Sequence, residues 1–242
     1  IKTHMKLENA DLGIAFDGDG DRLGVISKDR KLIHGDILTA FLAGDILRKK
    51  NQQQIILDVK SSQTAIKLIE DQGGISEIAQ TGHSLMKVKL KKTGAPLAGE
   101  MSGHIFFNDS WFGFDDAIYA ALRCIQEIGL RDGGLKKFLK FIPLSFTSPE
   151  IRIDCKDEEK FRIIKKIKNF VLNDYQISQI LLIDGVRINS EVGWWLIRAS
   201  NTQAAIIVRA EGFSKTNLDI LLKEISNYLI KANSNINLYE YL

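Results

Sequence analysis

The residues with the clearest chemical potential are aspartates that alternate with glycines: Asp17, Gly18, Asp19, Gly20 and Asp21. Apolar runs lie on both sides, so the aspartates are predicted to occupy a tight loop between two strands, residues 12–16 and 23–26. The glycines allow positive φ angles, which lets alternate side chains converge. Crowded carboxylates repel one another unless a cation neutralises them. Oxygen ligands of this kind suit a hard divalent ion, so the loop is predicted to bind Mg²⁺.

Two other interpretations of this loop are a solvated acidic turn and a calcium-binding EF-hand. The solvated turn stays open, although the apolar strands leave little room for an idle charge cluster. An EF-hand needs Gly at the sixth position of its loop and Glu at the twelfth, where this chain has Arg22 and Lys28. The EF-hand is therefore excluded.

A second group of candidate residues lies at the end of a predicted strand: Arg198, Ser200, Asn201 and Thr202. Arginine holds phosphate through two parallel hydrogen bonds, and hydroxyl, amide and backbone N–H groups complete an anion cradle. The same residues are good turn formers, so a plain polar hairpin turn is an equal alternative. Arg209, one strand later, either joins the cradle or pairs with Glu211.

A third group lies in a loop bracketed by glycines: Glu100, Ser102 and His104. A carboxylate, a hydroxyl and an imidazole can together hold a polyhydroxylated ligand and move protons. His83 lies in another glycine-containing loop, after Gly82, and joins this group. A lone histidine is more often structural, and His4 and His34 are interpreted in that way.

The elements that must position these residues follow from apolar patterns. Residues 31–33 are a possible third strand beside the acidic loop, and the next predicted strands are residues 55–59, 75–79 and 105–107. The predicted helices are residues 37–47, 64–71, 85–92, 117–128 and 135–141. Their cap candidates are Asp36, Ser61 or Ser62, and the Asp115–Asp116 pair, for which a cap is favoured over a further acidic site.

The alternation of strands and helices predicts an α/β fold, a mixed-to-parallel three-layer domain. In such sheets, ligands bind where strands end and helices begin, which groups Lys60 with His83 and the acidic loop.

Beyond residues 145–149, interpreted as a linker, the pattern changes. Predicted strands at residues 150–154, 180–183, 194–199 and 205–210 and helices at 157–172 and 218–230 indicate a small α+β domain with an antiparallel sheet. The lysines of the first of these helices, Lys160, Lys165, Lys166 and Lys168, are interpreted as a solvated face.

Composition excludes several classes of protein. The chain has 242 residues, 45% hydrophobic and 26% charged, with a net charge of +3. This charge is too small to indicate nucleic-acid binding, and no apolar run approaches the roughly 18 residues that span a bilayer. Two distant cysteines, Cys124 and Cys155, indicate reduced thiols and a cytoplasmic setting. Because Ile1 is not an initiator methionine, we expect the C-terminal part of a longer protein.

Five motifs, in order along the chain, resemble the α-D-phosphohexomutase superfamily, closest to its bacterial phosphomannomutase/phosphoglucomutase members. They lie at residues 16–22, 58–60, 81–84, 99–104 and 198–202. The resemblance implies domains at residues 1–33 (the end of domain 2, with the metal loop), 34–144 (sugar-binding domain 3) and 145–242 (phosphate-binding domain 4).

The resemblance also implies reversible phosphoryl transfer between the 1- and 6-positions of mannose or glucose phosphate, through a bisphosphate and a phosphoserine. The implied Mg²⁺ ligands are Asp17, Asp19 and Asp21. The implied catalytic residues are Arg22, Lys60, His83 and His104, with His104 transferring the proton. The implied substrate ligands are Gly82, His83, Glu100, Ser102, His104, Arg198, Ser200, Asn201, Thr202 and Arg209. The implied partners are hexose phosphates, hexose 1,6-bisphosphate and the missing N-terminal domains, with neither nucleic acid nor membrane.

The chain departs from the family pattern most clearly in lacking the phosphoserine loop, so we expect no turnover by the isolated 242 residues. We also expect residues 12–16 to leave an apolar strand edge that is prone to association. Smaller departures are Ser61-Ser62-Gln63 after Lys60 and Gln203-Ala204 after Thr202.

Two alternative functions stay open. A haloacid-dehalogenase-like phosphatase would use Asp17 as its nucleophile, but it expects Thr or Val where Asp21 stands and leaves Arg198 unexplained. A non-catalytic module that binds sugar phosphates is the other.

Overall fold

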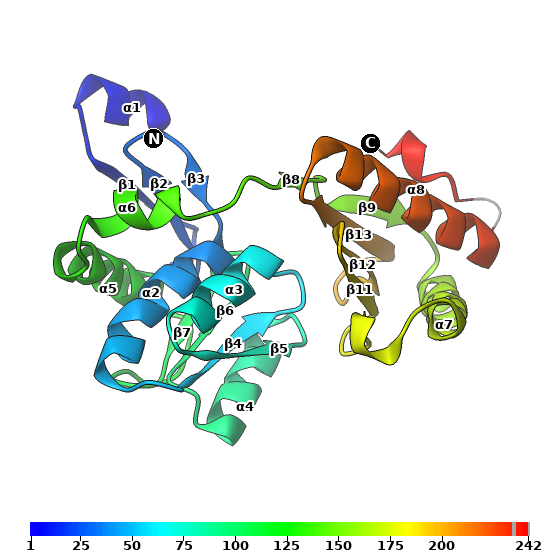
Figure 1. The fold of residues 1–242 in the computed structure, drawn as a ribbon, viewed down its shortest axis with the longest axis horizontal. Coiled ribbons are helices and arrows are strands. Elements are labelled where there is room, and N and C mark those ends of the chain that lie inside the picture. The colour runs from blue at the N-terminus through cyan, green and yellow to red at the C-terminus, as the bar shows by residue number, and fades with distance from the viewer. Residues whose placement is uncertain (234–235, 242) are drawn as a thin grey trace. The chain divides into compact units, whose positions relative to one another are not determined.

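The computed structural model describes residues 1–233 and 236–241, which form two compact units, Ile1–Pro143 and Leu144–Leu242. Figure 1 shows the first unit in blue to green and the second in green to red. Each unit has its own hydrophobic core. Among the described residues, no helix has both the length and the apolar character needed to cross a membrane.

The first unit begins with helix α1 (Lys2–Leu7) and a small antiparallel sheet in the order β1-β2-β3. Its strands are β1 (Leu12–Phe16), β2 (Leu23–Ser27) and β3 (Leu32–Ile33). Phe16 pairs with Leu23, so the six residues between them form the turn of a hairpin. Within the described part of the chain, β1 pairs on one side only, and its other edge is the one expected to associate.

The larger sheet of the first unit has the order β5-β4-β6-β7. Its strands are β4 (Gln54–Asp58), β5 (Ile75–Ala79), β6 (Leu97–Gly99) and β7 (Ile105–Phe107). Strand β4 runs parallel to β5 and β6, and β7 is antiparallel to β6. Strand β6 was not predicted, because three residues are too few to show a strand period. All three of its residues are buried beside β4.

Helices cover both faces of this sheet (Figure 1). Helices α2 (Gly35–Lys49), α3 (Gln63–Asp71) and α5 (Ala117–Leu130) pack on one face. Helix α4 (His83–Thr93) packs on the other, through Met86 and Leu90 against Ile56 and Phe106. Helix α6 (Gly134–Lys140) follows α5. The mixed, three-layer α/β domain predicted from the sequence is thereby confirmed.

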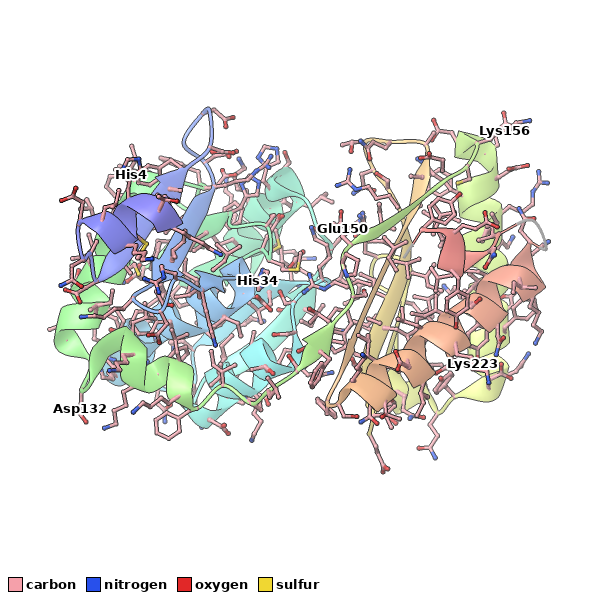
Figure 2. The ribbon with its side chains drawn as sticks, turned by 90° about the horizontal axis from the view of Figure 1, so that it is seen from above. His4, His34, Asp132, Glu150, Lys156 and Lys223 are labelled. Carbon is pink, nitrogen blue, oxygen red and sulfur yellow. The ribbon has the colours of Figure 1, made fainter. Side chains whose placement is uncertain are left out.

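Two of the predicted helix caps are confirmed and one is wrong. Ser62 accepts a hydrogen bond from the amide of Ala65, and Asp116 accepts one from the amide of Tyr119. Asp36 is not a cap, because α2 begins at Gly35, two residues before the predicted start, with His34, labelled in Figure 2, at its N-cap. The buried Asp36 carboxylate instead accepts a hydrogen bond from the amide of Ser62 at 2.8 Å. It therefore ties the start of α2 to the turn after β4.

The second unit is an antiparallel sheet in the order β10-β11-β12-β13-β8, with β9 also paired to β13. Its strands are β8 (Phe146–Thr147), β9 (Ile151–Asp154), β10 (Ile180–Leu181), β11 (Val186–Ser190), β12 (Gly193–Ala199) and β13 (Ala205–Gly212). Helices α7 (Asp157–Asp174) and α8 (Lys215–Ala232) share a core with it. Two short 3₁₀ turns, Ile177–Gln179 and Leu238–Glu240, complete the unit. This confirms the predicted α+β domain.

Two details of the second unit differ from the prediction. Residues 145–149 are not simply a linker, because β8 pairs with Glu211 and Gly212. Strand β11 was missed because its alternating residues Arg187 and Asn189 are polar and interrupt the apolar run, although Arg187 is fully buried.

Helices α7 and α8 carry a pair of acidic groups whose repulsion depends on pH. Burial, and after it the nearby charge of Asp174, raises the pKa of Glu224 from its usual 4.5 to about 7. Between those pH values the unfolded chain has released this proton and the folded chain has not, so rising pH favours unfolding. Because solvent still reaches the side chain, screening limits the loss to about 1–2 kcal/mol.

We therefore expect Glu224→Gln to flatten the decline of unfolding free energy between pH 4.5 and 7. Urea denaturation of both proteins across this range measures the difference. Identical pH slopes for the two proteins would show that Glu224 is not responsible.

Candidate functional site

The acidic loop between β1 and β2 brings its three carboxylates together. One oxygen of each of Asp17, Asp19 and Asp21 lies within 4.8 Å of the others. Asp17 Oδ1 accepts hydrogen bonds from the amides of Asp21 and Arg22, both at 3.2 Å, which closes the loop on itself. Gly20 has a φ of +74°, a conformation that glycine adopts without strain. These oxygen donors fit Mg²⁺.

The electrostatics of this loop favour a bound cation. Burial raises the pKa of Asp21, and the neighbouring charges of Asp17 and Asp19 raise it further, although His104 opposes them. Burial also acts to raise the pKa of Asp17, but hydrogen bonds from the loop backbone, led by that of Arg22, keep it below its usual value. A divalent ion between the carboxylates would relieve this repulsion.

Arg22 and His104 join the acidic loop to the loop between β6 and β7. Arg22 Nε donates to His104 Nε2 at 3.2 Å, and the two residues form a β-bridge. The amide of Leu23 donates to the carbonyl of Gly103 at 3.0 Å. Gly103 has a φ of +103°, and a Cβ there would lie 2.8 Å from the Leu23 carbonyl oxygen. Only glycine permits this close approach.

Asp58, at the end of β4, connects three turns. Its fully buried carboxylate accepts hydrogen bonds from Ser61 Oγ at 2.8 Å, Thr81 Oγ1 at 2.9 Å and the amide of Met101 at 3.0 Å. Lys60 Nζ lies 3.8 Å from the same carboxylate. From the sequence, Asp58 was predicted only as part of the motif at residues 58–60, without a role of its own.

Glu100 is the first residue of the loop between β6 and β7 and is buried. Its carboxylate accepts hydrogen bonds from the amide of Gly82 and from Ser102 Oγ, both at 3.1 Å. Burial raises the pKa of Glu100, and the charge of Asp58 raises it further. Glu100 therefore fixes Gly82, which has a φ of +129° at the start of α4, beside Ser102.

Asp115 is a site residue that the sequence analysis missed, because it was interpreted with Asp116 as a helix cap. One oxygen, Oδ2, lies 3.2 Å from His83 Nδ1 and 3.0 Å from His104 Nδ1. The other, Oδ1, accepts a hydrogen bond from Lys87 at 3.0 Å. Burial acts to raise the pKa of Asp115, but hydrogen bonds led by that of Lys87, together with the charges of Lys87 and His104, outweigh it and lower the pKa. The sequence did hold one indication: of the adjacent Asp115 and Asp116, only one can cap the helix, which leaves the other available for another role.

A cavity of about 280 Å³ lies beside these residues in the first unit. It is lined by Phe16, Asp17, Arg22, His34 and Ser102 among others. His34, interpreted from the sequence as structural, therefore borders the site, whereas His4 lies on α1 (Figure 2).

The second unit carries the Arg198 loop. Arg198 Nε donates to Asp184 Oδ2 at 3.0 Å, and its Nη2 has no hydrogen-bond partner in the described part of the chain. The same holds for Arg209 Nε, and both side chains are buried. Glu211 accepts a hydrogen bond from Trp194 Nε1 at 2.7 Å. Buried guanidinium groups with unused N–H donors favour an anion ligand.

The prediction that Lys160 lies on a solvated face of its helix is wrong. It is 5% exposed, and its Nζ donates to the carbonyls of Ser200 and Gln203, each at 2.9 Å. Ser200 Oγ in turn accepts from the amides of Thr202 and Gln203 at 3.4 and 3.2 Å. A lysine of α7 therefore holds the Arg198 loop from below, a contact that no helical period reveals.

The structure thus gathers the predicted site residues within each unit separately. The first unit brings together Asp17, Asp19, Asp21, Arg22, Lys60, Gly82, His83, Glu100, Ser102 and His104. The second carries Arg198, Ser200, Asn201, Thr202 and Arg209.

Family models identify both units. Residues 34–143 match the phosphoglucomutase/phosphomannomutase alpha/beta/alpha domain III, and residues 150–227 match the C-terminal domain IV. The chain belongs to the phosphoglucomutase/phosphomannomutase family.

Individual relatives agree with that family assignment. A phosphomannomutase/phosphoglucomutase of Pseudomonas aeruginosa is 39% identical over 96% of this chain and 50% of its own length. The crystal structure of a family protein from Burkholderia thailandensis superimposes with a TM-score of 0.89 at 35% identity, covering 98% of this chain and 50% of that one. An N-acetylphosphoglucosamine mutase of Aspergillus fumigatus, solved with GlcNAc-6P and magnesium, shares the fold at a TM-score of 0.60 and 18% identity over 96% of this chain and 52% of that one. The chain spans about half the length of these relatives.

We expect Asp58→Asn to destabilise the first unit by about 1–3 kcal/mol, because an amide NH₂ replaces one buried acceptor and leaves a donor unpaired. Urea denaturation measures this. The control is Asp71→Asn, whose side chain is 58% exposed and should leave the midpoint unchanged. Equal midpoints for the two variants would contradict the role given to Asp58.

We expect Lys160→Met to loosen the Arg198 loop, because two buried carbonyls lose their donor. Hydrogen exchange at the Thr202 and Gln203 amides should rise about tenfold. Lys165→Met, on an exposed position of the same helix, is the matched control. Unchanged exchange in Lys160→Met would mean that the loop holds itself.

Proposed function

We propose that the protein is a phosphohexomutase that moves a phosphoryl group reversibly between the 1- and 6-positions of mannose or glucose phosphate. The observation that carries this proposal is the position of His104. It contacts Arg22 of the acidic loop and Asp115 at the start of α5, and it follows the loop that holds Glu100 and Ser102. A proton acceptor thus lies between a candidate metal loop and a candidate sugar-binding loop.

Asp17, Asp19 and Asp21 are the proposed Mg²⁺ ligands. Their clustered oxygens and the raised pKa of Asp21, caused first by burial, support this assignment. When bound, the metal would neutralise charge that develops on the phosphoryl oxygens. Arg22, which lies 3.3 Å from Asp17, would add a second positive charge at the same place.

The remaining residues of the first unit would hold and deprotonate the sugar. Glu100 and Ser102 offer hydrogen-bonding groups for hydroxyls, beside Gly82. His104 would accept the proton from the attacking hydroxyl, with the Asp115 carboxylate 3.0 Å from its Nδ1. Lys60 and His83 are the other two proposed catalytic residues of this unit; Lys60 lies beside Asp58 and His83 beside Asp115.

Arg198, Ser200, Asn201 and Thr202, with Arg209, would bind the phosphate that does not react. The unused donors of the two buried guanidinium groups support this assignment. If this loop can hold either the 1- or the 6-phosphate, the sugar can bind in two orientations and place its other end at the transfer site, as a 1,6-transfer requires. The Aspergillus enzyme named above was solved with a phosphosugar and magnesium, the same classes of ligand as those proposed for this protein.

The phosphoserine that donates the phosphoryl group would come from outside residues 1–242, so we infer that these residues alone bind hexose phosphates without turning them over. The proposal predicts that the product of the complete reading frame interconverts mannose 1-phosphate and mannose 6-phosphate, or the glucose phosphates, in a Mg²⁺-dependent assay. Failure with both sugars would overturn it in favour of a binding module. Turnover by the 242 residues alone would contradict the missing nucleophile.

The phosphatase alternative is not favoured, because the family match includes the domain with the Arg198 loop, which that alternative left unexplained. A labile phosphate trapped on Asp17 would revive it.

We expect Asp115→Asn in the complete enzyme to lower kcat by roughly ten- to a hundredfold with little change in KM, because His104 loses the carboxylate charge that lies 3.0 Å from its Nδ1. The rate should also follow a shifted pH profile, which a purely structural role would not produce. Asp109→Asn, a partner of Arg123, is the matched control. Equal losses in both variants would indicate general destabilisation.

A further inference from the structure

Two histidines and two aspartates converge beside the acidic loop. Ligand atoms of Asp21, His83, His104 and Asp115 all lie within 4.8 Å of one another. Imidazole nitrogens with carboxylate oxygens are the donors that Zn²⁺ prefers, whereas the acidic loop offers oxygen only. The two donor sets share Asp21 and differ in all other members.

The distances within this group match a tetrahedral ion. Bonds of about 2.0 Å place tetrahedral ligands about 3.3 Å apart. Asp115 Oδ2 lies 3.0 Å from His104 Nδ1 and 3.2 Å from His83 Nδ1. Asp21 Oδ2 lies 3.6 Å from His104 Nδ1. Three of the distances between ligand atoms are therefore already close to the tetrahedral value.

An unsatisfied buried atom points to a ligand at this place. His104 is only 7% exposed, and its Nδ1 has no hydrogen-bond partner among the described residues. It lies near two carboxylate oxygens but outside hydrogen-bonding geometry. A buried nitrogen in this state is costly unless something binds it.

The surrounding charges permit a cation. Lys87 is hydrogen bonded to Asp115 Oδ1, so Oδ2 stays directed at the two imidazoles. Coordination through His104 Nδ1 requires its proton on Nε2, which removes the hydrogen bond from Arg22. The Arg22 side chain is 55% exposed and can turn into solvent. The half-exposed His83 leaves a route for entry.

We propose that Asp21, His83, His104 and Asp115 form a site for a borderline divalent ion such as Zn²⁺, distinct from the oxygen-only Mg²⁺ set of Asp17, Asp19 and Asp21 but sharing Asp21 with it. Its effect on activity rests on the proposed function. An ion on His104 Nδ1 removes that imidazole from proton transfer and draws Asp21 away from Mg²⁺, so micromolar Zn²⁺ inhibits the enzyme.

The test is Zn²⁺ binding to residues 1–242, measured by competition with a chromophoric chelator in excess Mg²⁺ and without sugar. We expect one Zn²⁺ per chain. His83→Asn should weaken it by at least tenfold, a loss of about 1.4 kcal/mol or more. His83 is half exposed, so this variant should fold. His4→Asn, on α1, is the matched histidine control and should bind as the parent chain does.

Asp19→Asn separates the two metal sites, because Asp19 belongs only to the oxygen set. It should weaken Mg²⁺ binding and leave Zn²⁺ binding intact. Co²⁺ as a substitute probe should show the intense visible absorption of a tetrahedral ion in the parent and in Asp19→Asn, but not in His83→Asn.

Three outcomes would overturn the proposal: no Zn²⁺ binding, binding unaffected by His83→Asn, or binding lost in Asp19→Asn, which would place Zn²⁺ in the acidic loop. Because no sugar is present, each outcome is independent of whether the protein is a mutase.

Discussion

The buried carboxylate of Asp58 is the interaction on which the candidate site of the first unit depends. It ends the central strand β4 and accepts hydrogen bonds from the turn after β4, from Thr81 before α4 and from Met101 in the loop after β6. A fully buried carboxylate is costly without such donors, so the three turns and the charge require one another. The parallel strands bring the turns to one sheet edge, and Asp58 fixes their spacing.

In the second unit, a buried positive charge holds a loop in a similar way. Lys160 is buried against the Arg198 loop, hydrogen bonded to two of its backbone carbonyls and paired with the carboxylate of Asp157. In both units a buried charge from a strand or helix holds a loop that carries some exposed polar residues, Ser102 in the first unit and Asn201 and Thr202 in the second. The loops can therefore be polar and open without being loosely held.

The sequence predicted what local patterns encode. Ile75–Ala79 and Ile105–Phe107 have their predicted bounds, and Ser62 caps its helix as expected. The errors concern partners that are distant in sequence: Asp36 bonds to a residue 26 positions away, and Lys160 to residues 40 and 43 positions away. Asp115 was missed for the same reason, since its partners lie on α4 and after β6. Side-chain type and period identify an element, but the partner of a buried charge is set by the tertiary fold.

The most direct test of this account is amide hydrogen exchange in Asp58→Asn. If one carboxylate joins the three turns, exchange should rise together, by roughly tenfold, at the amides of Ser61, Gly82 and Met101. A rise confined to Ser61, with Gly82 and Met101 unchanged, would contradict the account, because each turn would then be held by its own local contacts.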